Sequence, residues 1–289
     1  MNIPVLATGL SGLVGSRINE MLSDRFDFQD LSYATNIDIT NPGQLEKAFA
    51  DSPAKVVLHL AAKTDVDSCE DDKLLGEEGQ AWKVNVLGTE NIISAARETR
   101  KRIIYISTDF VFDGTKDFYE EKDEPNPVSW YGYTKYLGEE QLLKSDTEVT
   151  ILRISYPYRN YNNVRSDFVH RLIEIMNQKH KVYGLTDHIF TPTFIDDIAN
   201  ALPLFLNKNL PGIYHLVGSQ SLETIDAVKM IRDTYNLNAE IIPIDRKHYF
   251  KNRAFRPFKL ALNNDKIKNL GLNMAAFSQG LKVIKNQDS

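Results

Sequence analysis

The sequence predicts an α/β fold, a doubly wound parallel sheet that carries a smaller α/β lobe. In the first half, short β-rich runs alternate with helical runs, which is the rhythm of parallel strands joined by crossover helices. A turn with three glycines directly follows the first apolar run. From Pro157 onward the pattern loosens into loops rich in aromatic residues, Asn and Arg, with helices between them.

Each element follows from a local pattern. Apolar runs predict strands at 3–7, 28–33, 56–60, 102–107 and 149–154, and helical periodicity predicts helices at 13–22, 42–49, 81–99 and 129–143. Asn41-Pro42 marks the start of the second helix, because Asn caps free amides and Pro fits the first helical position. The second half is expected to hold helices at 167–177, 195–206 and 225–235.

The composition is that of an ordinary globular enzyme. Hydrophobic residues make up 42% and charged residues 25% of 289 residues, and the net charge of -5 argues against a nucleic-acid binder. The single Cys69 excludes an intrachain disulfide, and six scattered histidines show no zinc-ligand spacing. No apolar stretch approaches the ~20 residues that span a bilayer. We therefore expect a cytoplasmic protein with no metal, no membrane anchor and no nucleic-acid partner.

The glycine turn reads Gly9-Leu-Ser11-Gly12-Leu13-Val14-Gly15, between the first strand and the first helix. Glycine permits the sharp turn, and the free amides of a helix N-terminus favour a pyrophosphate. This context predicts a Rossmann-type NAD(P)-binding domain at 1–155, to which 185–218 return. Residues 156–184 and 219–289 are then expected to form the substrate lobe. Because the second strand ends near 32–33 with neither an acid nor an arginine at its tip, NAD(H) and NADP(H) both stay open.

Tyr131 and Lys135 are the expected catalytic pair. They are four residues apart and share one face of a predicted helix. A phenol with a pKa of ~10 becomes a usable acid when an ammonium lies ~4 to 5 Å away, and Lys135 is expected to lower this pKa by roughly 2 to 3 units. Tyr-x-x-x-Lys alone is a weak signal. Its position after a glycine turn, and after an apolar strand that ends in Ser107-Thr108, predicts hydride-transfer chemistry.

Further segments carry a family resemblance. The G-x-x-G-x-x-G spacing, Ser-Thr-Asp-Phe-Val-Phe-Asp-Gly at 107–114, and residues 59–70, 85–91 and 212–218 resemble the dTDP-4-dehydrorhamnose reductase family of extended short-chain dehydrogenase/reductases. The resemblance is nearly end to end. It implies reduction of the 4-keto group of a dTDP-linked deoxysugar with a nicotinamide cofactor, in dTDP-rhamnose and polysaccharide biosynthesis.

The resemblance also implies roles for particular residues. Thr108 would hydrogen-bond the substrate carbonyl, and Tyr156 would lie near the sugar. The other implied residues are Asp38 and Ile39 at the adenine, Leu60, Ala61, Ala62 and Lys63 along the cofactor, and Thr64, Asp65, Val66 and Asp67 beside the sugar. Arg256-Pro257 matches the Arg-Pro of the family, whereas Lys63 replaces an aromatic residue and Leu260 a common serine.

Several alternatives stay open. The basic run from Arg246 to Lys259 is either a diphosphate clamp or, by default, a solvated charged loop. Capping and loop solvation explain Asp187 and His188 adequately. The activity expected is that of an NAD(P)-dependent oxidoreductase on a nucleotide sugar. An NAD-dependent nucleotide-sugar epimerase or dehydratase, and a regulatory subunit like the β subunit of methionine adenosyltransferase, are the competing hypotheses. A homodimer is one option for its assembly.

Overall fold

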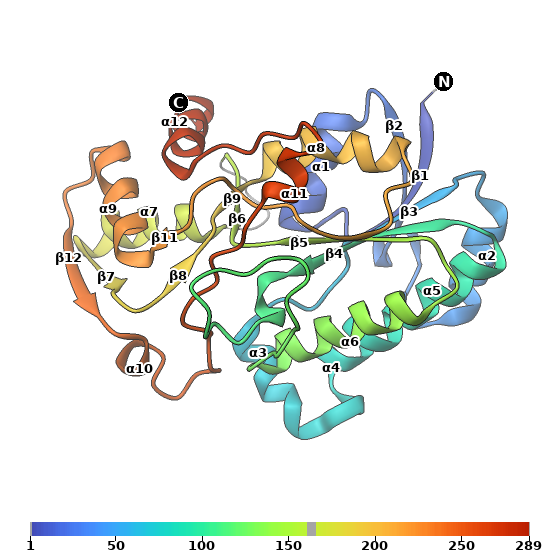
Figure 1. Cartoon of the computed structure of the whole chain (residues 1–289), viewed down its shortest axis with the longest axis horizontal. Helices are drawn as coiled ribbons and strands as arrows, with labels where there is room; N and C mark the ends of the chain where they lie inside the picture. The colour runs from blue at the N-terminus through green and yellow to red at the C-terminus, as the bar shows by residue number, and fades with distance from the viewer. Residues whose placement is uncertain (1, 161–165, 289) are drawn as a thin grey trace.

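The computed structural model describes residues 2–160 and 166–288. Its largest element is a parallel sheet of six strands in the order β2-β1-β3-β4-β5-β10 (Figure 1). The strands are β1 (Ile3–Thr8), β2 (Phe26–Leu31), β3 (Val56–His59), β4 (Arg102–Thr108), β5 (Val149–Ile154) and β10 (Gly212–His215). The chain passes from β1 to β2 on one side and then returns to β3 on the other. The switch point, where such folds bind ligands, therefore lies between β1 and β3.

Helices cover both faces of this sheet. α1 (Leu13–Leu22) and α8 (Ile195–Asn207) pack on one face, and α2 (Pro42–Asp51), α5 (Gly88–Glu98) and α6 (Trp130–Lys144) lie on the other (Figure 1). Two apolar clusters fill the two interfaces. The central strands are buried in nearly every position and mostly apolar, as expected for a parallel sheet that is covered on both faces.

A second group of elements packs beside the sheet, at the left of Figure 1. Its helices α7 (Phe168–Lys179), α9 (Thr224–Tyr235) and α12 (Phe277–Asp288) share a third apolar cluster. Three short strand pairs accompany them: β7 (Lys181–Leu185) with β12 (Glu240–Ile244), β8 (Ile189–Phe190) with β11 (Leu222–Glu223), and β6 (Pro157–Tyr158) with β9 (Thr193–Phe194).

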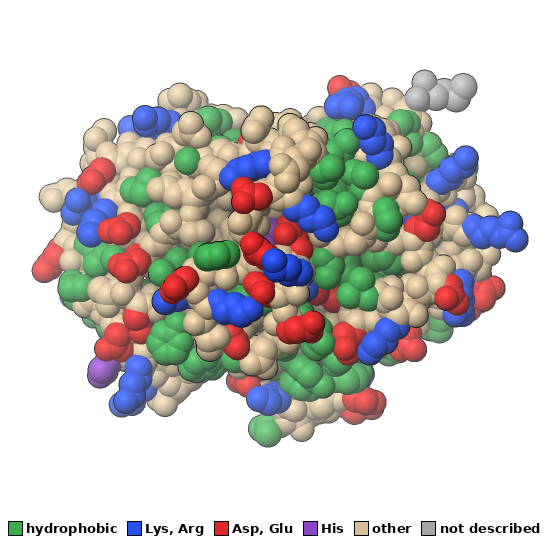
Figure 2. Space-filling view, viewed as in Figure 1, with side chains coloured by type: hydrophobic (Ala, Val, Ile, Leu, Met, Phe, Trp, Pro, Cys, Tyr) green, Lys and Arg blue, Asp and Glu red, His purple; other side chains and the backbone are tan. Residues whose placement is uncertain are grey.

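The remaining elements are short. They are η1 (Tyr33–Thr35), α3 (Val66–Asp72), η2 (Lys73–Glu78), α4 (Gln80–Trp82), η3 (Lys83–Leu87), η4 (Asp109–Val111), α10 (Arg246–Tyr249) and α11 (Asp265–Lys268). Acidic and basic side chains are interspersed on the face of the molecule that Figure 2 shows. Within 2–160 and 166–288, no helix is long and apolar enough to cross a membrane.

The predicted fold class is confirmed, with local corrections. β2 starts and ends two residues earlier than the predicted 28–33, because Ser32 leaves the strand to cap η1, where its hydroxyl accepts from Ala34 N. The helix predicted at 81–99 contains a π-helical turn, η3, and π turns are common at functional sites. β10 and α8 belong to the main sheet and its covering layer. The proposed domain boundaries stay a prediction.

Candidate functional site

The glycine turn joins β1 to α1 at the switch point. Gly9 has φ +72°, a left-handed conformation that favours glycine, and a Cβ there would lie 2.6 Å from Ala61 N. Gly12 is the N-cap of α1, and no side chain of the described residues caps the helix there. The first-turn amides, which include those of Leu13 and Val14, therefore point free of side-chain partners toward the turn, where Ser11 is exposed. This arrangement fits a pyrophosphate group.

The loop after β3 is held against this turn by buried polar contacts. Thr8 Oγ1 accepts hydrogen bonds from the amides of Leu60 and Ala61. Asn85, on the π turn, accepts from Lys63 N and donates to Lys63 O. The expected cofactor-lining segment thus lies directly beside Gly9. The Lys63 ammonium is already paired with Asp72 at 2.8 Å.

Asp38 and Ile39 lie between β2 and α2. Asp38 Oδ1 accepts from the amide and the hydroxyl of Thr40, and Ile39 is buried in the core under α5. Their contact with adenine stays a prediction.

Because β2 ends at Leu31, Asp30 lies near the end of the strand, whereas the predicted strand at 28–33 had placed it inside. Asp30 is the penultimate residue of β2 and shares a face with Phe28, the face that α1 covers. One carboxylate oxygen accepts from Ser32 Oγ at 2.6 Å, and the other is buried without a hydrogen-bond partner among the described residues. An acid at this place is the usual partner of a ribose hydroxyl.

Thr108, Tyr131 and Lys135 meet where β4 ends. Thr108 is the last residue of β4, and Ser129 starts α6 by accepting from Gly132 N, so that Tyr131 lies in the first turn and Lys135 one turn later. The side chains of Tyr131 and Thr108 adjoin, and Thr108 counteracts the effect of burial on the pKa of Tyr131. The Lys135 ammonium donates to Ile106 O at 2.8 Å, on the same strand. All three side chains are buried. The structure therefore brings the predicted trio together.

The electrostatics of this trio differ from the prediction. Burial raises the pKa of Tyr131, Thr108 opposes this shift, and among the described residues Lys135 is not one of the groups that affect this pKa. The predicted lowering by Lys135 is wrong for the protein without a ligand. The ammonium instead lies 3.9 Å from the centre of the Tyr105 ring, and burial lowers the pKa of Lys135 to about 7 against the attraction of Glu139.

Asp109 is a buried acid that sequence reasoning missed. It follows Thr108, and its Oδ1 lies 3.1 Å from Thr108 Oγ1 while its Oδ2 accepts from Ser155 Oγ at 2.7 Å. Burial raises the pKa of Asp109 to about 7. Asp109 directly follows Thr108 in the sequence, and this position could have identified it as a candidate site residue.

Tyr156 lies against the same site from the end of β5. It adopts φ +39°, a strained conformation for a tyrosine, and strain of this kind concentrates at functional sites. Its ring packs 4.6 Å from that of Phe190, and its hydroxyl lies 3.3 Å from His188 Nε2. Solvation does not explain His188, which is 3% exposed and whose pKa burial lowers to about 3.

The basic loop from Arg246 to Lys259 is only partly solvated. Arg246 is 5% exposed and stacks 3.3 Å from the centre of the Phe258 ring, so the default interpretation fails for this residue. Arg256 Nη1 donates to Asp67 Oδ1 at 2.6 Å and thereby ties the loop to α3. Both guanidinium groups act electrostatically on Tyr156.

The residues expected to border the sugar form the start of α3. Asp65 caps this helix by accepting from Ser68 N, Val66 is its first residue, and Thr64 is exposed just before it. Arg256 lowers the pKa of Asp67. The predicted sugar-side residues and Arg256 therefore do meet.

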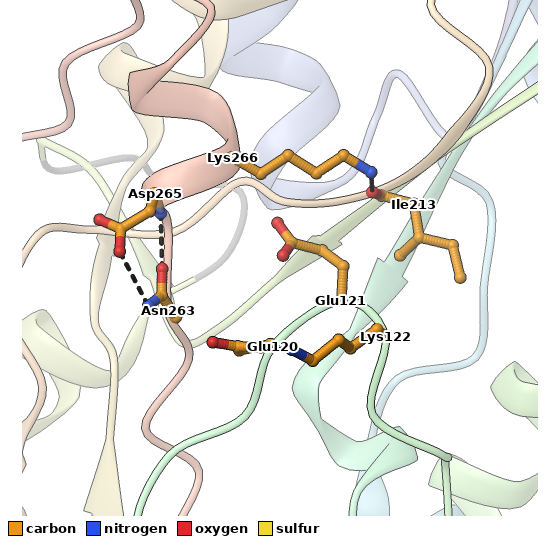
Figure 3. Close-up of a pocket in the computed structure, with 7 residues that line it drawn as sticks. All are labelled: Glu120, Glu121, Lys122, Ile213, Asn263, Asp265 and Lys266. Carbon is orange, nitrogen blue, oxygen red and sulfur yellow. Dashed lines mark hydrogen bonds and ion pairs between the residues drawn. The ribbon is translucent and has the colours of Figure 1, made fainter.

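An open hollow of about 400 Å³ lies elsewhere, and Figure 3 shows its lining residues, Glu120, Glu121, Lys122, Ile213, Asn263, Asp265 and Lys266. Its polar groups serve local structure: Lys266 donates to Ile213 O, and Asn263 and Asp265 bond each other. None of the predicted site residues lines it. Within the described ranges, no group of three or more His, Cys, Asp or Glu could hold a metal ion.

Comparisons with known proteins bear on this site. Residues 1–288 match the model of the family described as RmlD substrate binding domain. The chain is 31% identical over 238 residues to dTDP-4-dehydrorhamnose reductase of Aggregatibacter actinomycetemcomitans, which covers 79% of this chain and 78% of that protein. It is 26% identical to methionine adenosyltransferase 2 subunit beta of Mus musculus, over 98% of this chain and 88% of the other.

A solved structure of a dTDP-4-dehydrorhamnose reductase is also similar to this chain. The dTDP-4-dehydrorhamnose reductase of Bacillus anthracis str. Ames, in complex with NADP, superposes with a TM-score of 0.90 at 26% identity and covers 99% of this chain and 100% of its own.

Proposed function

The chain belongs to the RmlD substrate binding domain family, and from this we propose that it is an NAD(P)H-dependent oxidoreductase that reduces the 4-keto group of a nucleotide-linked deoxysugar. The observation that carries the proposal is the meeting of Thr108, Tyr131 and Lys135 at the end of β4. A reaction that makes dTDP-L-rhamnose for polysaccharides, by a short-chain dehydrogenase/reductase mechanism, fits this site.

The turn from Gly9 to Gly15 and the loop 60–63 would hold the cofactor, whose nicotinamide supplies a hydride when it is bound. Tyr131 protonates the forming alkoxide, and Thr108 holds that oxygen in place. Lys135 anchors the ribose. When its ammonium group turns away from Ile106 O, it also stabilises the phenolate of Tyr131. Because burial raises the pKa of Tyr131, its proton is retained until negative charge develops on the substrate oxygen.

The sugar nucleotide would lie between Tyr156 and the start of α3, where Thr64, Asp65 and Val66 line its path. Arg256 would exchange its bond to Asp67 for the diphosphate, because a guanidinium matches phosphate geometry. His188 fixes the hydroxyl of Tyr156 at 3.3 Å and keeps that ring against the sugar.

Asp30 favours NADH over NADPH in this proposal. A carboxylate at the end of β2 bonds a ribose 2′-hydroxyl and repels a 2′-phosphate. Asp38 and Ile39 would flank the adenine. Replacement of Asp30 by Ser should raise the ratio of kcat/KM for NADPH to kcat/KM for NADH, and an unchanged ratio would separate Asp30 from cofactor choice.

The function is tested by incubating the purified protein with dTDP-4-keto-6-deoxyhexose and following the absorbance of NADH or NADPH. We expect stoichiometric oxidation, and we expect Tyr131→Phe to lower kcat by roughly 10² to 10⁴ with cofactor affinity retained. Oxidation that Tyr131→Phe leaves unchanged would refute the assignment.

Two other outcomes correspond to the competing hypotheses. An epimerase or dehydratase would copurify with bound NAD and convert nucleotide sugars without net oxidation. A regulatory subunit, the hypothesis that the similarity to methionine adenosyltransferase 2 subunit beta keeps open, would show no turnover and would retain a catalytic partner in a pull-down. The expected homodimer, the cytoplasmic location and the domain boundaries stay predictions.

A further inference from the structure

Asp109 has a place in the site that the proposed roles do not use. Its carboxyl is 2% exposed and has two hydroxyl partners, Thr108 at 3.1 Å and Ser155 at 2.7 Å. Thr108 Oγ1 also accepts from Phe110 N at 3.3 Å. Thr108 is thus surrounded by groups that compete for one hydroxyl.

A threonine hydroxyl has a single hydrogen and two lone pairs. If Asp109 is a carboxylate, it accepts that hydrogen, and Thr108 has none left for a substrate. If Asp109 is protonated, its own O–H donates to Thr108 Oγ1. The second lone pair then accepts from Phe110 N, and the hydrogen of Thr108 is left for the Tyr131 side of the site, where the keto oxygen would bind.

We propose that Asp109 is a positioning residue that works in its protonated form, donating to Thr108 so that the Thr108 hydrogen serves the keto oxygen of the substrate. The inference rests on the proposed function, because it assigns the geometry of that same reduction. Ser155 donates to the other oxygen, Oδ2, and so fixes which oxygen of Asp109 carries the proton. No bond is made or broken at Asp109.

The surroundings of Asp109 favour the neutral form. The titratable groups that face it are Tyr131 from α6 and Tyr156 beyond β5, and the charge of Asp109 raises the pKa of both. Lys135, also on α6, donates to Ile106 O, and the cations Arg246 and Arg256 act on Tyr156. Burial raises the pKa of Asp109 to about 7, and a neutral acid that donates in a buried site has precedent in other enzymes.

The proposal predicts the pH dependence of the holoenzyme. In the wild type, kcat/KM should fall with rising pH by about tenfold per pH unit once Asp109 ionises. Asp109→Asn should abolish this fall, because its amide donates to Thr108 at every pH, and its kcat/KM below the transition should stay within a few-fold of wild type. Asp109→Ala should be impaired at every pH.

Ser155→Ala provides a second variant. The Ser155 hydrogen bond lowers the pKa of Asp109, so its loss should move the fall in kcat/KM to higher pH. A transition that persists unchanged in Asp109→Asn would overturn the proposal and assign the transition to Lys135 or Tyr131. The proposal would also be overturned if kcat/KM of Ser155→Ala fell at the same pH as that of the wild type.

An infrared titration tests Asp109 without turnover. The ligand-free protein should show a protonated carboxyl C=O band below neutral pH that disappears as the pH rises and is missing from Asp109→Asn. If the band is seen but no nucleotide sugar is reduced, the proposed function fails while the protonated state of Asp109 stands. If reduction occurs and no such band is found, the proposal about Asp109 alone fails.

Discussion

Glu139→Gln should strongly destabilise the fold, because Glu139 on α6 and Arg153 on β5 form a buried ion pair. Arg153 on β5 donates through Nε and Nη2 to the two carboxylate oxygens of Glu139 on α6, at 3.0 and 2.6 Å. Each side chain is 1% exposed. The variant leaves the guanidinium buried beside a neutral amide, and its Nη1 already has no hydrogen-bond partner among the described residues.

The expected loss follows from the burial of this charge. Removing one partner of a buried pair costs about 3 to 5 kcal/mol, whereas an exposed pair contributes about 0.2 to 1 kcal/mol. Urea unfolding, followed by circular dichroism, measures the free energy of unfolding. Asp226→Asn is the matched control, because Asp226 and Lys229 form a pair at 2.8 Å with both side chains about half exposed. This control should change the free energy by less than about 0.5 kcal/mol.

The double variant Glu139→Leu/Arg153→Met separates charge from packing. Because apolar residues of similar size often replace buried pairs without loss, it should recover most of the stability that Glu139→Gln loses. A loss below about 1 kcal/mol in Glu139→Gln would contradict this prediction and would mean that Arg153 is effectively solvated or finds another partner.

Two further predictions concern the glycine turn and the second group of helices. Gly15→Ala should weaken NAD(P)H binding at least roughly tenfold, about 1.4 kcal/mol, because its Cβ would lie 2.4 Å from Gly9 O. The control is Gly43→Ala, whose Cβ would lie 3.6 Å from its nearest neighbouring atom, and this variant should bind NAD(P)H normally in the same titration. Burial lowers the pKa of His170, but the carboxylates of Asp167 and Asp288 outweigh this effect and raise the pKa from 6.5 to about 9. The protonated His170 therefore stabilises the fold fully below pH 6.5, and this stabilisation is lost as the pH rises through 9. Urea midpoints across this range should fall in the wild type and change less in His170→Asn, and parallel curves would contradict the assignment.

The sequence predicted best those site residues whose positions depend on a single helix, strand or turn. The glycine turn follows a strand and opens a helix, and Tyr131 and Lys135 share one helical face, so local spacing was sufficient to place them. Thr108 required only that β4 end at the carboxyl edge of the sheet.

What the sequence could not predict depends on packing between distant segments. His188 is buried because Tyr156 and Thr224 contact its two ring nitrogens, and Arg246 is buried because Phe258 stacks on it. Similarly, the direction of the Lys135 ammonium is set by contacts with β4, the ring of Tyr105 and the carbonyl oxygen of Ile106. None of these contacts leaves a periodic signal in the chain.

The register of β2 is a smaller case. Apolar residues stand at 26, 28, 31 and 33, so the alternation breaks at Gln29-Asp30 and the pattern alone does not fix where the strand ends. The cap made by Ser32 ends it, and this moves Asp30 to the tip.

The most direct test is a crystal structure of the protein with NADP⁺ or NAD⁺ and a dTDP-linked 6-deoxyhexose. We expect the sugar O4 to lie within about 2.6 to 3.2 Å of both Tyr131 Oη and Thr108 Oγ1, with the nicotinamide ring on the other side of C4. A sugar whose O4 contacts neither hydroxyl, or a cofactor that avoids the turn at Gly9–Gly15, would contradict it.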